Sequence, residues 1–427
     1  MIKKTNHQGR REFLKTSAAM AISLSIPLSG FTDKKTPVII LRSSWQTVNI
    51  GDIGHTPGVL ALLEKYIPQA QVRLWPSDVG NGVEQMLAKR FPKVEIIKTD
   101  ADRKRAMSEA DFMLHGSGPS LVARATLEEW AKTGKPYGVY GITFPGVYGT
   151  PEQAKKASPK DVELLNNARF AFFRDSVSLN LAKEIGVKCP IMEFGPDGAF
   201  AVDVKDDESA IRFLKEHDLQ EGRFLCVIPR YRYTPWWKIP SKNRTIENDK
   251  DAINQKMKEH DNGPIRDAIV AVIRQTSMKV LICPEDETQM EIGKEMLYDK
   301  LPEDVKSRVV LREKYWLTDQ AVSTYIRSAG LFGLEMHSPI MCVGNGIPAT
   351  VGRFAEQTSK GLMWKDIGLG DWLFDMDVPG DVSAITPAVL AIAKDPKTAK
   401  KKALKARDFV IKRQRETMEI VKKNLYS

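Results

Sequence analysis

The sequence predicts an α/β fold with two doubly wound parallel sheets that face each other across a cleft. Three observations lead to this prediction. Short apolar runs alternate with amphipathic stretches of helical period, a second such series begins after residues 203–207, and polar loops rich in glycine follow several of the runs. With 427 residues, of which 42% are hydrophobic, the chain is long enough for two Rossmann-like domains with separate cores.

The first domain is expected to cover residues 37–203. Its apolar runs have the length of buried strands, and most are followed by a helical stretch. The expected strands are Val38–Leu41, Gln71–Trp75, Val94–Lys98, Asp111–His115, Pro136–Ile142, Phe170–Arg174 and Ile191–Phe194, and the expected helices are Gly58–Tyr66, Val83–Arg90, Ser120–Lys132 and Ser176–Ile185.

The second domain is expected to cover residues 204–393. It repeats the alternation without repeating the sequence, so the similarity between the halves is architectural. The expected helices are Glu208–His217, Pro264–Gln275, Thr288–Lys300 and Thr318–Ser328; the expected strands are Phe224–Ile228, Lys279–Ile282, Val309–Leu311 and two further apolar runs, one ending at Glu335 and one covering Ile347–Val351.

Residues 394–427 form a basic C-terminal segment. It holds twelve Lys or Arg against four Asp or Glu, a net charge of +8, whereas the rest of the mature chain is close to neutral. Leu404, Ile411, Met418 and Leu425 are seven residues apart, which predicts one helix packing a single apolar stripe on the body. Contact of its basic face with an anionic glycan or a membrane surface is the alternative use of this charge.

Residues 1–30 are expected to be a targeting segment and not a part of the fold. Arg10 and Arg11 precede Phe13-Leu14-Lys15, and an apolar run follows over residues 18–28. This order matches the twin-arginine export signal, which predicts a periplasmic or extracytoplasmic protein. A basic N-terminal helix is the alternative.

The four cysteines are widely spaced, and no C-x-x-C pair occurs among Cys189, Cys226, Cys283 and Cys342. We therefore expect buried free thiols, no metal site and no cofactor. The sequence contains no recognised nucleic-acid-binding motif, so we expect no nucleic-acid partner.

Polar side chains follow several predicted strands. Ligands of open α/β sheets bind at the carboxyl ends of the strands, where loops and helix N-termini offer free N–H groups. Asp52 and His55 follow the first strand, and a helix-capping turn is the alternative role for this loop. His115 and Ser117 follow the fourth strand in a small-residue loop that suits an anion or hydroxyl. Arg174 ends the sixth strand and could pair with an anion; a structural pair with Asp175 that caps the next helix is the alternative.

An aromatic and basic loop follows the strand Phe224–Ile228. Aromatic faces stack on sugar rings, while Arg and Lys hold carboxylates or sulfates, so the loop is expected to face a glycan; packing at the domain seam is the alternative. Its candidate substrate-binding residues are Arg230, Tyr231, Arg232, Tyr233, Trp236 and Trp237.

Glu335 and His337 end a strand-like run, and a short helical segment and a second run follow them. A carboxylate and an imidazole at such a place are candidate general acid and base groups. A hydrogen-bonded structural histidine is the alternative for His337.

Five segments, in this order, resemble the polysaccharide pyruvyl transferase family. They are N-I-G-D (49–52), G-S-G-P (116–119), F-F-R-D-S-V-S (172–178), G-P-D-G-A-F (195–200), and H-S-P-I with G-I-P and a later lysine, Lys360 or Lys365. The resemblance covers most of residues 45–375. It implies a fold similar to GT-B glycosyltransferases, and transfer of a pyruvyl group from phosphoenolpyruvate to a sugar as a ketal, with no metal strictly implied.

Two features depart from that family. Glu335-Met336-His337 stand where the family usually carries Arg-x-His, so an anion replaces a cation expected to face the donor. Phosphoenolpyruvate is a cytoplasmic metabolite, whereas the export signal points out of the cytoplasm. We therefore predict an exported enzyme that cleaves a glycosidic bond or a pyruvyl ketal of an acidic polysaccharide or oligosaccharide without a donor, as a hydrolase or lyase, with Glu335, His337 and Asp52 as catalytic residues.

Two alternatives stay open. A pyruvyl transferase would bind its donor through Arg174, Arg230 or Arg353. A non-catalytic glycan-binding protein would keep the aromatic loop and tolerate the loss of Glu335 and His337.

Overall fold

The computed structural model describes residues 36–426 apart from 44, 145–156 and 358. The predicted export signal, residues 1–30, lies outside these described residues. Pro37–Ser427 form one compact unit. None of the helices in the described part is both long and apolar enough to cross a membrane.

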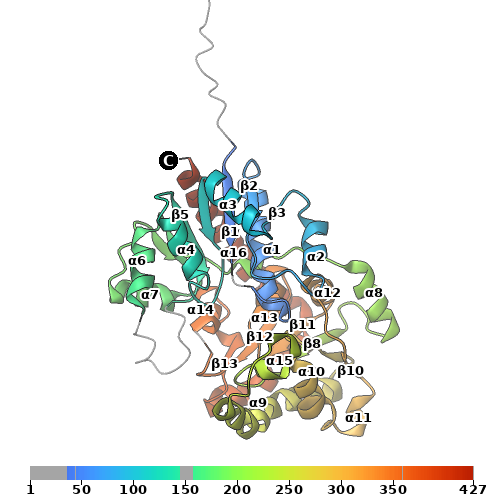
Figure 1. Ribbon diagram of the computed structural model, residues 1–427. Helices are drawn as coiled ribbons and strands as arrows, with labels where there is room; N and C mark the ends of the chain where they lie inside the picture. The colour runs from blue at the N-terminus through green and yellow to red at the C-terminus, as the bar shows by residue number, and fades with distance from the viewer. Residues whose placement is uncertain (1–35, 44, 145–156, 358, 427) are drawn as a thin grey trace, which may run out of the picture. The chain divides into compact units, whose positions relative to one another are not determined.

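The first sheet has seven parallel strands in the order β3-β2-β1-β4-β5-β6-β7. Figure 1 labels β1, β2, β3 and β5 of this sheet. Ile39 in β1, an inner strand, lies opposite Val72 of β2 on one side and Phe112 of β4 on the other. The strands are β1 Val38–Arg42, β2 Gln71–Leu74, β3 Glu95–Ile96, β4 Phe112–His115, β5 Tyr137–Ile142, β6 Ala171–Phe173 and β7 Met192–Phe194. The helices are α1 Ile50–Tyr66, α2 Val83–Arg90, α3 Asp100–Glu109, α4 Arg124–Ala131, α6 Pro159–Asn167, α7 Ser176–Ile185 and the 3-10 turn η1 Gly198–Ala201.

The second sheet has six parallel strands in the order β10-β9-β8-β11-β12-β13. The strands are β8 Phe224–Ile228, β9 Lys279–Ile282, β10 Val309–Leu311, β11 Gly330–Gly333, β12 Ala349–Arg353 and β13 Leu373–Asp375. The helices are α8 Asp207–Glu216, α9 Asn248–Gln275, α10 Gln289–Ile292, α11 Glu303–Lys306, α12 Thr318–Tyr325, α13 His337–Gly344, α14 Met363–Asp366, α15 Pro379–Lys394 and α16 Pro396–Leu425. Short turns lie at η2 Trp236–Lys238, η3 Pro240–Lys242, η4 Gly293–Tyr298, η5 Ser359–Leu362 and η6 Gly370–Trp372.

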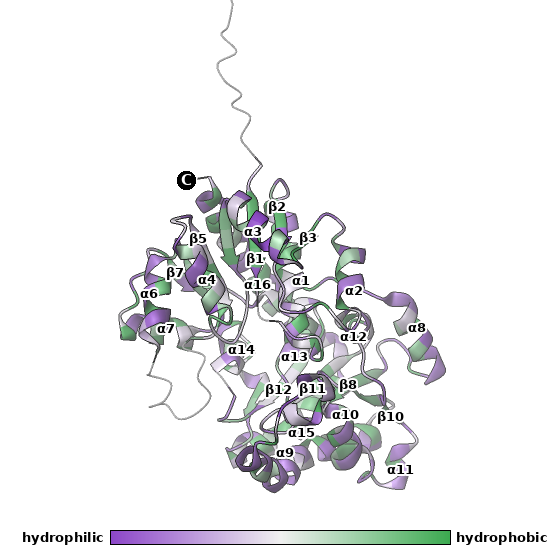
Figure 2. Cartoon of the chain, in the orientation of Figure 1, coloured by the Kyte–Doolittle hydropathy of each residue, from purple (hydrophilic) through white to green (hydrophobic). Residues whose placement is uncertain are grey.

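The predicted fold class is confirmed, since both sheets are parallel and doubly wound. Strands β8, β9 and β10 have the predicted bounds. Their side chains are largely buried, and in Figure 2 the labelled strand β8 is coloured as hydrophobic. Helices α3 and α6 were not predicted, because their sequences carry few apolar residues at helical spacing.

Helix α1 begins at Ile50 and not at the predicted Gly58. The Asn49 side chain caps it by accepting hydrogen bonds from the backbone N–H groups of Gly51 and Asp52. The glycines and Pro57 of this turn suggested a loop, yet here they sit within the helix. The correction matters for function because Asp52 and His55 now lie on one helical turn.

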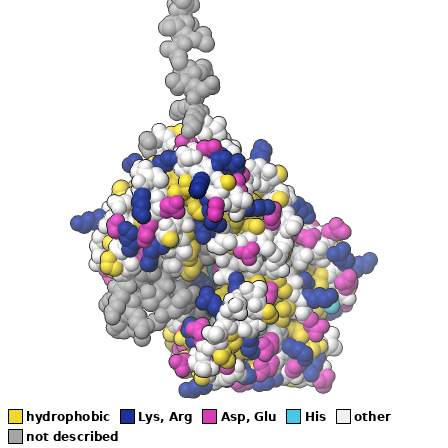
Figure 3. Space-filling view, viewed as in Figure 1, with side chains coloured by type: hydrophobic (Ala, Val, Ile, Leu, Met, Phe, Trp, Pro, Cys, Tyr) yellow, Lys and Arg dark blue, Asp and Glu magenta, His cyan; other side chains and the backbone are white. Residues whose placement is uncertain are grey.

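Helix α16 packs on α1 and α13. Its buried stripe follows a period of 3.6 residues and includes Ala403, Val410, Met418 and Val421. Ile411, expected in the apolar stripe from the seven-residue spacing, is 38% exposed. That spacing drifts around a straight helix, so the prediction placed part of the stripe one residue too far along. Membrane-surface contact of α16 stays a prediction. The face of the molecule drawn in Figure 3, which does not single out α16, has interspersed basic and acidic side chains.

Helix α1 carries the contact between the two sheets' domains. Its first backbone N–H, at Ile50, donates to the carbonyl of Glu285 over 2.9 Å, and Thr318 Oγ1 donates to the Ile50 carbonyl over 2.8 Å. Gly58 lets the helix touch η1, since a Cβ there would lie 1.9 Å from the Gly198 carbonyl oxygen. The start of α1 is therefore fixed against the second domain.

All four cysteines belong to the described residues, and all are buried and unpaired. The expectation of buried free thiols is confirmed. Burial raises the pKa of Cys189 to about 11, which makes this thiol unreactive at neutral pH.

Candidate active site

A cavity of about 310 Å³ lies at the carboxyl ends of the strands of the first sheet. Arg42 ends β1, Arg174 follows β6, Asp52 lies in the first turn of α1 and His337 is the first residue of α13. The lining residues are Arg42, Ser43, Trp45, Gln46, Asp52, Ser77, Pro119, Val122, Arg174, Trp236, His337 and Lys360. The cavity thus combines residues of both domains.

The charge of the lining is positive, because Arg42, Arg174 and Lys360 face one carboxylate, that of Asp52. Arg42 donates from its guanidinium to the carbonyl of Trp75 and to Ser77 Oγ, which fixes it at the rim. Burial lowers the pKa of Lys360, and nearby Glu335 opposes this shift. A concave site of this charge suits an anionic ligand.

Arg174 is fully buried and firmly held. Its Nε donates to Thr143 Oγ1 over 2.6 Å, and one terminal nitrogen donates to Asp197 Oδ2 over 2.8 Å. The other terminal nitrogen is buried and has no hydrogen-bond partner within the described part of the chain. Since a guanidinium has donors in a fixed fork, this nitrogen is available for a ligand oxygen in the cavity.

His55 is fully buried beside the same carboxylate, with its Nδ1 2.9 Å from Asp197 Oδ1. Burial alone would raise the pKa of Asp197, but His55 and Arg174 more than offset it and hold the pKa well below its usual range. An ionised carboxylate only accepts hydrogen bonds, so His55 Nδ1 carries a proton and donates it to Asp197.

His337 also contacts a carboxyl group through Nδ1, that of Glu285. Burial raises the pKa of this carboxyl, with Lys360 and Ser338 opposing the shift, whereas the pKa of Asp197 is lowered. The His337 Nδ1 lies 3.1 Å from Glu285 Oε1, while Glu285 Oε2 accepts from the N–H and hydroxyl of Ser338. Burial, then Lys360 and His55, lower the pKa of His337 well below its usual value, so this ring is neutral. The His55 and His337 rings meet edge to face, with centroids 4.7 Å apart. Asp52 and the two histidines therefore form one group at the cavity.

Glu335 lies behind this group and does not line the cavity. One terminal nitrogen of Arg230 lies 2.6 Å from Glu335 Oε1, which also accepts from Gln289 Nε2 over 2.8 Å. Burial raises the pKa of Glu335, and Arg230 opposes the shift. The sequence argument for a reversed charge considered Glu335 alone, whereas Arg230 from another segment supplies the positive charge next to it.

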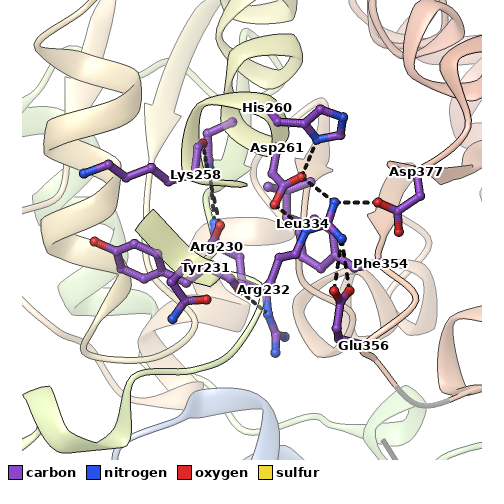
Figure 4. Close-up of polar contacts among 12 residues, drawn as sticks. Arg230, Tyr231, Arg232, Lys258, His260, Asp261, Leu334, Phe354, Glu356 and Asp377 are labelled. Atoms are coloured by element: carbon purple, nitrogen blue, oxygen red, sulfur yellow. Dashed lines mark hydrogen bonds and ion pairs between the residues drawn. The ribbon is translucent and has the colours of Figure 1, made fainter. Parts of the chain in front are cut away.

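Side chains of the loop after β8 mostly contact other residues of the protein (Figure 4). Arg232 forms ion pairs with three carboxylates, those of Asp261, Glu356 and Asp377. Tyr231 is buried. The stacking argument overlooked these internal partners, which come from distant parts of the chain.

The other predicted site residues divide in the same way. Trp236 lines the cavity, whereas Tyr233 and Trp237 do not. His115 is buried at the end of β4, and Ser117 Oγ accepts from the N–H of Gly198. Arg353 pairs with Asp375 over 2.8 Å, away from the cavity lining. Of the two candidate lysines of the family pattern, Lys360 lines the cavity and Lys365 is exposed.

Sequence reasoning missed the first part of the loop after β1. Arg42, Ser43, Trp45 and Gln46 all line the cavity. They follow directly after the first predicted strand, so the rule that ligands bind at the carboxyl ends of strands could have found them. The prediction considered only the glycine-containing part of this loop, with Asp52 and His55, and not the five residues 42–46 that precede Thr47.

The fold of this chain is similar to the folds of several solved structures, including these three. Alr3699/HepE of Anabaena, in complex with UDP and glucose, gives a TM-score of 0.55 at 10% identity over 91% of this chain and 100% of that one. UDP-GlcNAc 2-epimerase of Neisseria meningitidis, bound to UDP-GlcNAc, gives 0.55 at 11% over 91% and 100%. UGT2 of Phytolacca americana, complexed with UDP-2fluoro-glucose and pterostilbene, gives 0.54 at 12% over 92% and 100%. The fold is therefore GT-B-like.

The family profile described as polysaccharide pyruvyl transferase matches residues 78–350, more than half of the chain, and the chain belongs to this family. None of the curated proteins matches its sequence. Family and fold together define a glycan-modifying enzyme. The matched range includes His337 and Arg174 but not Asp52, His55 or Lys360, whose grouping comes from the structure.

Proposed function

We propose that this chain transfers a pyruvyl group from phosphoenolpyruvate to two hydroxyls of a polysaccharide. In this reaction both sugar oxygens bond to C2 of the donor, and the bond from C2 to the phosphate oxygen breaks. One hydroxyl proton converts the methylene to a methyl group, and the other leaves with the phosphate.

The positive cavity is the observation that carries this proposal. Its three cationic side chains, Arg42, Arg174 and Lys360, face a single lining carboxylate, and the donor carries both a carboxylate and a phosphate. A volume of about 310 Å³ suits a small donor together with part of one sugar residue.

His337 and the tryptophans supply the remaining requirements. The neutral His337 ring has an Nε2 lone pair when Nδ1 donates to an ionised Glu285, and it can accept the proton of a sugar hydroxyl. Trp45 and Trp236 give the lining apolar faces on which a sugar ring can stack.

The test mixes the full chain with phosphoenolpyruvate and a panel of acidic and neutral polysaccharides, and follows phosphate release and the ketal methyl signal by NMR. Arg174→Lys keeps the charge but loses the forked donor, so we expect the KM for phosphoenolpyruvate to rise about 10- to 100-fold, the equivalent of one charged hydrogen bond. Arg274→Lys is the matched control, because Arg274 also holds a carboxylate with two nitrogens, but at the surface. Equal KM values for both variants would contradict the proposed donor site.

Donor-independent cleavage is the second candidate, favoured by Asp52 and His337 lining the same cavity. The same panel without phosphoenolpyruvate decides between them. Released sugar or pyruvate in that arm would favour cleavage, whereas glycan binding without product in either arm would leave a glycan-binding protein.

Export by the twin-arginine route is a further proposal, motivated by Arg10-Arg11 before an apolar run. We expect the wild type in the extracytoplasmic fraction and the double variant Arg10→Lys, Arg11→Lys in the cytoplasmic fraction. An equal distribution of both would refute the export proposal without touching the chemistry.

A further inference from the structure

We propose that the Asp52 carboxylate and the Nε2 atoms of His55 and His337 together bind one divalent transition metal ion, and that zinc suits this site. The three side chains offer ligand atoms that all lie within 4.8 Å of one another. The proposal goes beyond pyruvyl transfer and departs from the sequence-based expectation of no metal. With the ion bound, the His337 Nε2 lone pair is engaged, so His337 can act as the base proposed above only in the metal-free chain.

Two unpartnered nitrogens point to a ligand. His55 Nε2 and His337 Nε2 are both buried, and neither has a hydrogen-bond partner in the described part of the chain. A buried polar nitrogen without a partner is unfavourable, because it has lost its hydrogen bonds to water and gained none in the protein. A shared ion would satisfy both nitrogens at once, and the half-buried Asp52 would balance part of its charge.

The surroundings of both rings are those of metal-bound histidines. Such histidines nearly always give their other ring N–H to a carboxylate or carbonyl, which fixes the tautomer and the orientation. His55 Nδ1 contacts Asp197 over 2.9 Å, and His337 Nδ1 contacts Glu285 over 3.1 Å. Both carboxylates have further donors, from Arg174 and Ser338, so both rings are held in place.

The three residues can come together because Gly51, between α1 and His337, has no side chain. Asp52 and His55 lie three residues apart on α1 and share one face of the helix. Gly51 allows His337 to approach, since a Cβ there would lie 2.3 Å from the His337 Cβ and 2.5 Å from its Nδ1.

Two imidazoles and one carboxylate are a donor set typical of zinc sites that keep positions open for a ligand. Zinc binds nitrogen at about 2.1 Å, so the ligand atoms must move together by about an ångström on binding. Asp52 can move, because its carboxylate makes no hydrogen bond within the described residues and faces the cavity. The open positions of the ion would face the space lined by Arg174 and Lys360.

The test treats the full chain with a chelator, removes the chelator and titrates Co²⁺ and then Zn²⁺. We expect one equivalent of Co²⁺ with visible absorption bands of a nitrogen–oxygen site, displaced by one equivalent of Zn²⁺. Loss of a residue that only hydrogen-bonds a metal ligand weakens metal binding by about 10- to 100-fold. Asp52→Asn and His337→Gln remove a ligand itself, so they should weaken binding by at least about this factor.

His260→Gln is the matched control, because His260 also has a carboxylate on Nδ1, that of Asp261 at 2.7 Å, but is half-exposed. It should bind the ion like the wild type. No stoichiometric binding by the wild type, or loss of binding in His260→Gln but not in Asp52→Asn, would overturn the proposal. Circular dichroism melting curves of all variants separate lost ligands from lost folding.

Donor binding is measured separately by titrating phosphoenolpyruvate into the chelator-treated chain. Donor binding without metal binding would refute the metal site and leave pyruvyl transfer standing. Metal binding without donor binding would refute pyruvyl transfer from phosphoenolpyruvate and leave the metal site standing.

Discussion

Replacing Gly51 with alanine tests the contact on which the whole site depends. The new Cβ would lie 2.3 Å from His337 Cβ and 2.6 Å from Glu285 Oε1. Carbon atoms in ordinary contact are about 3.5–4.0 Å apart, so α1 and α13 would have to separate by more than about 1 Å. Overpacking of this kind costs about 1–3 kcal/mol, and the helix preference of alanine returns at most about 1 kcal/mol. We expect a net loss of about 1–2 kcal/mol in the free energy of unfolding.

Urea unfolding measures this loss, and Gly380→Ala is its matched control. Gly380 also lies in the first turn of a helix, α15, but no other atom lies within 4 Å of the position of its Cβ. Alanine there should be neutral or stabilise by up to about 1 kcal/mol. If Gly51→Ala unfolds at the same urea concentration as Gly380→Ala, the packing argument is wrong.

The same variant should lose activity beyond its loss of stability. A shift of about 1 Å in a group near the reacting atoms can cost about 100-fold in rate. We expect kcat for the glycan reaction to fall by about this factor under conditions where Gly51→Ala is still folded. Full activity in the folded variant would show that the position of His337 against α1 is not needed for the reaction.

Three more variants test the surroundings of the site. Burial, then Arg42, lower the pKa of His115 to about 4, so only the unfolded chain takes up a proton as the pH falls from 6.5. The wild type should therefore lose about 2 kcal/mol more than His115→Leu between pH 7 and pH 5, measured by urea unfolding; equal losses would refute this. Arg232→Met leaves the buried Asp261 without its main cation and should lower the free energy of unfolding by about 3–5 kcal/mol, measured from melting curves. An unchanged melting temperature would show that these ion pairs do not stabilise the fold. Glu335→Gln should keep kcat/KM within about tenfold, because Glu335 does not line the cavity; a loss of about 100-fold or more would restore it as a catalytic acid.

The fold could be predicted because several strands of each sheet contain an uninterrupted apolar run. Phe224–Ile228 and Lys279–Ile282 have such runs, and their bounds were predicted without error. Helix α1 could not be predicted from Ile50 onward, because its first turn contains Gly51, Gly54 and Pro57 and is stabilised by a cap and by the opposite domain.

The site could be predicted only in part, for a related reason. Sequence shows which residues follow a strand, and this rule located Asp52, Arg174 and His337. It does not show which long side chains have partners elsewhere. Arg232 and Arg230 looked alike in the sequence, yet one binds three carboxylates and the other neutralises Glu335.

The Glu335–Arg230 pair changes how the family pattern should be interpreted here. A carboxylate at Glu335 seemed to exclude an anionic donor as long as it was considered alone. Glu335 is buried, and its Oε1 lies 2.6 Å from a terminal nitrogen of Arg230. Arg230 and Lys360 oppose the rise of its pKa that burial causes, so positive charge surrounds this carboxyl. The field that a donor meets is therefore set by the lining residues, where cations outnumber carboxylates. An anionic donor is compatible with this sequence because Arg230, from the loop after β8, neutralises the charge of Glu335.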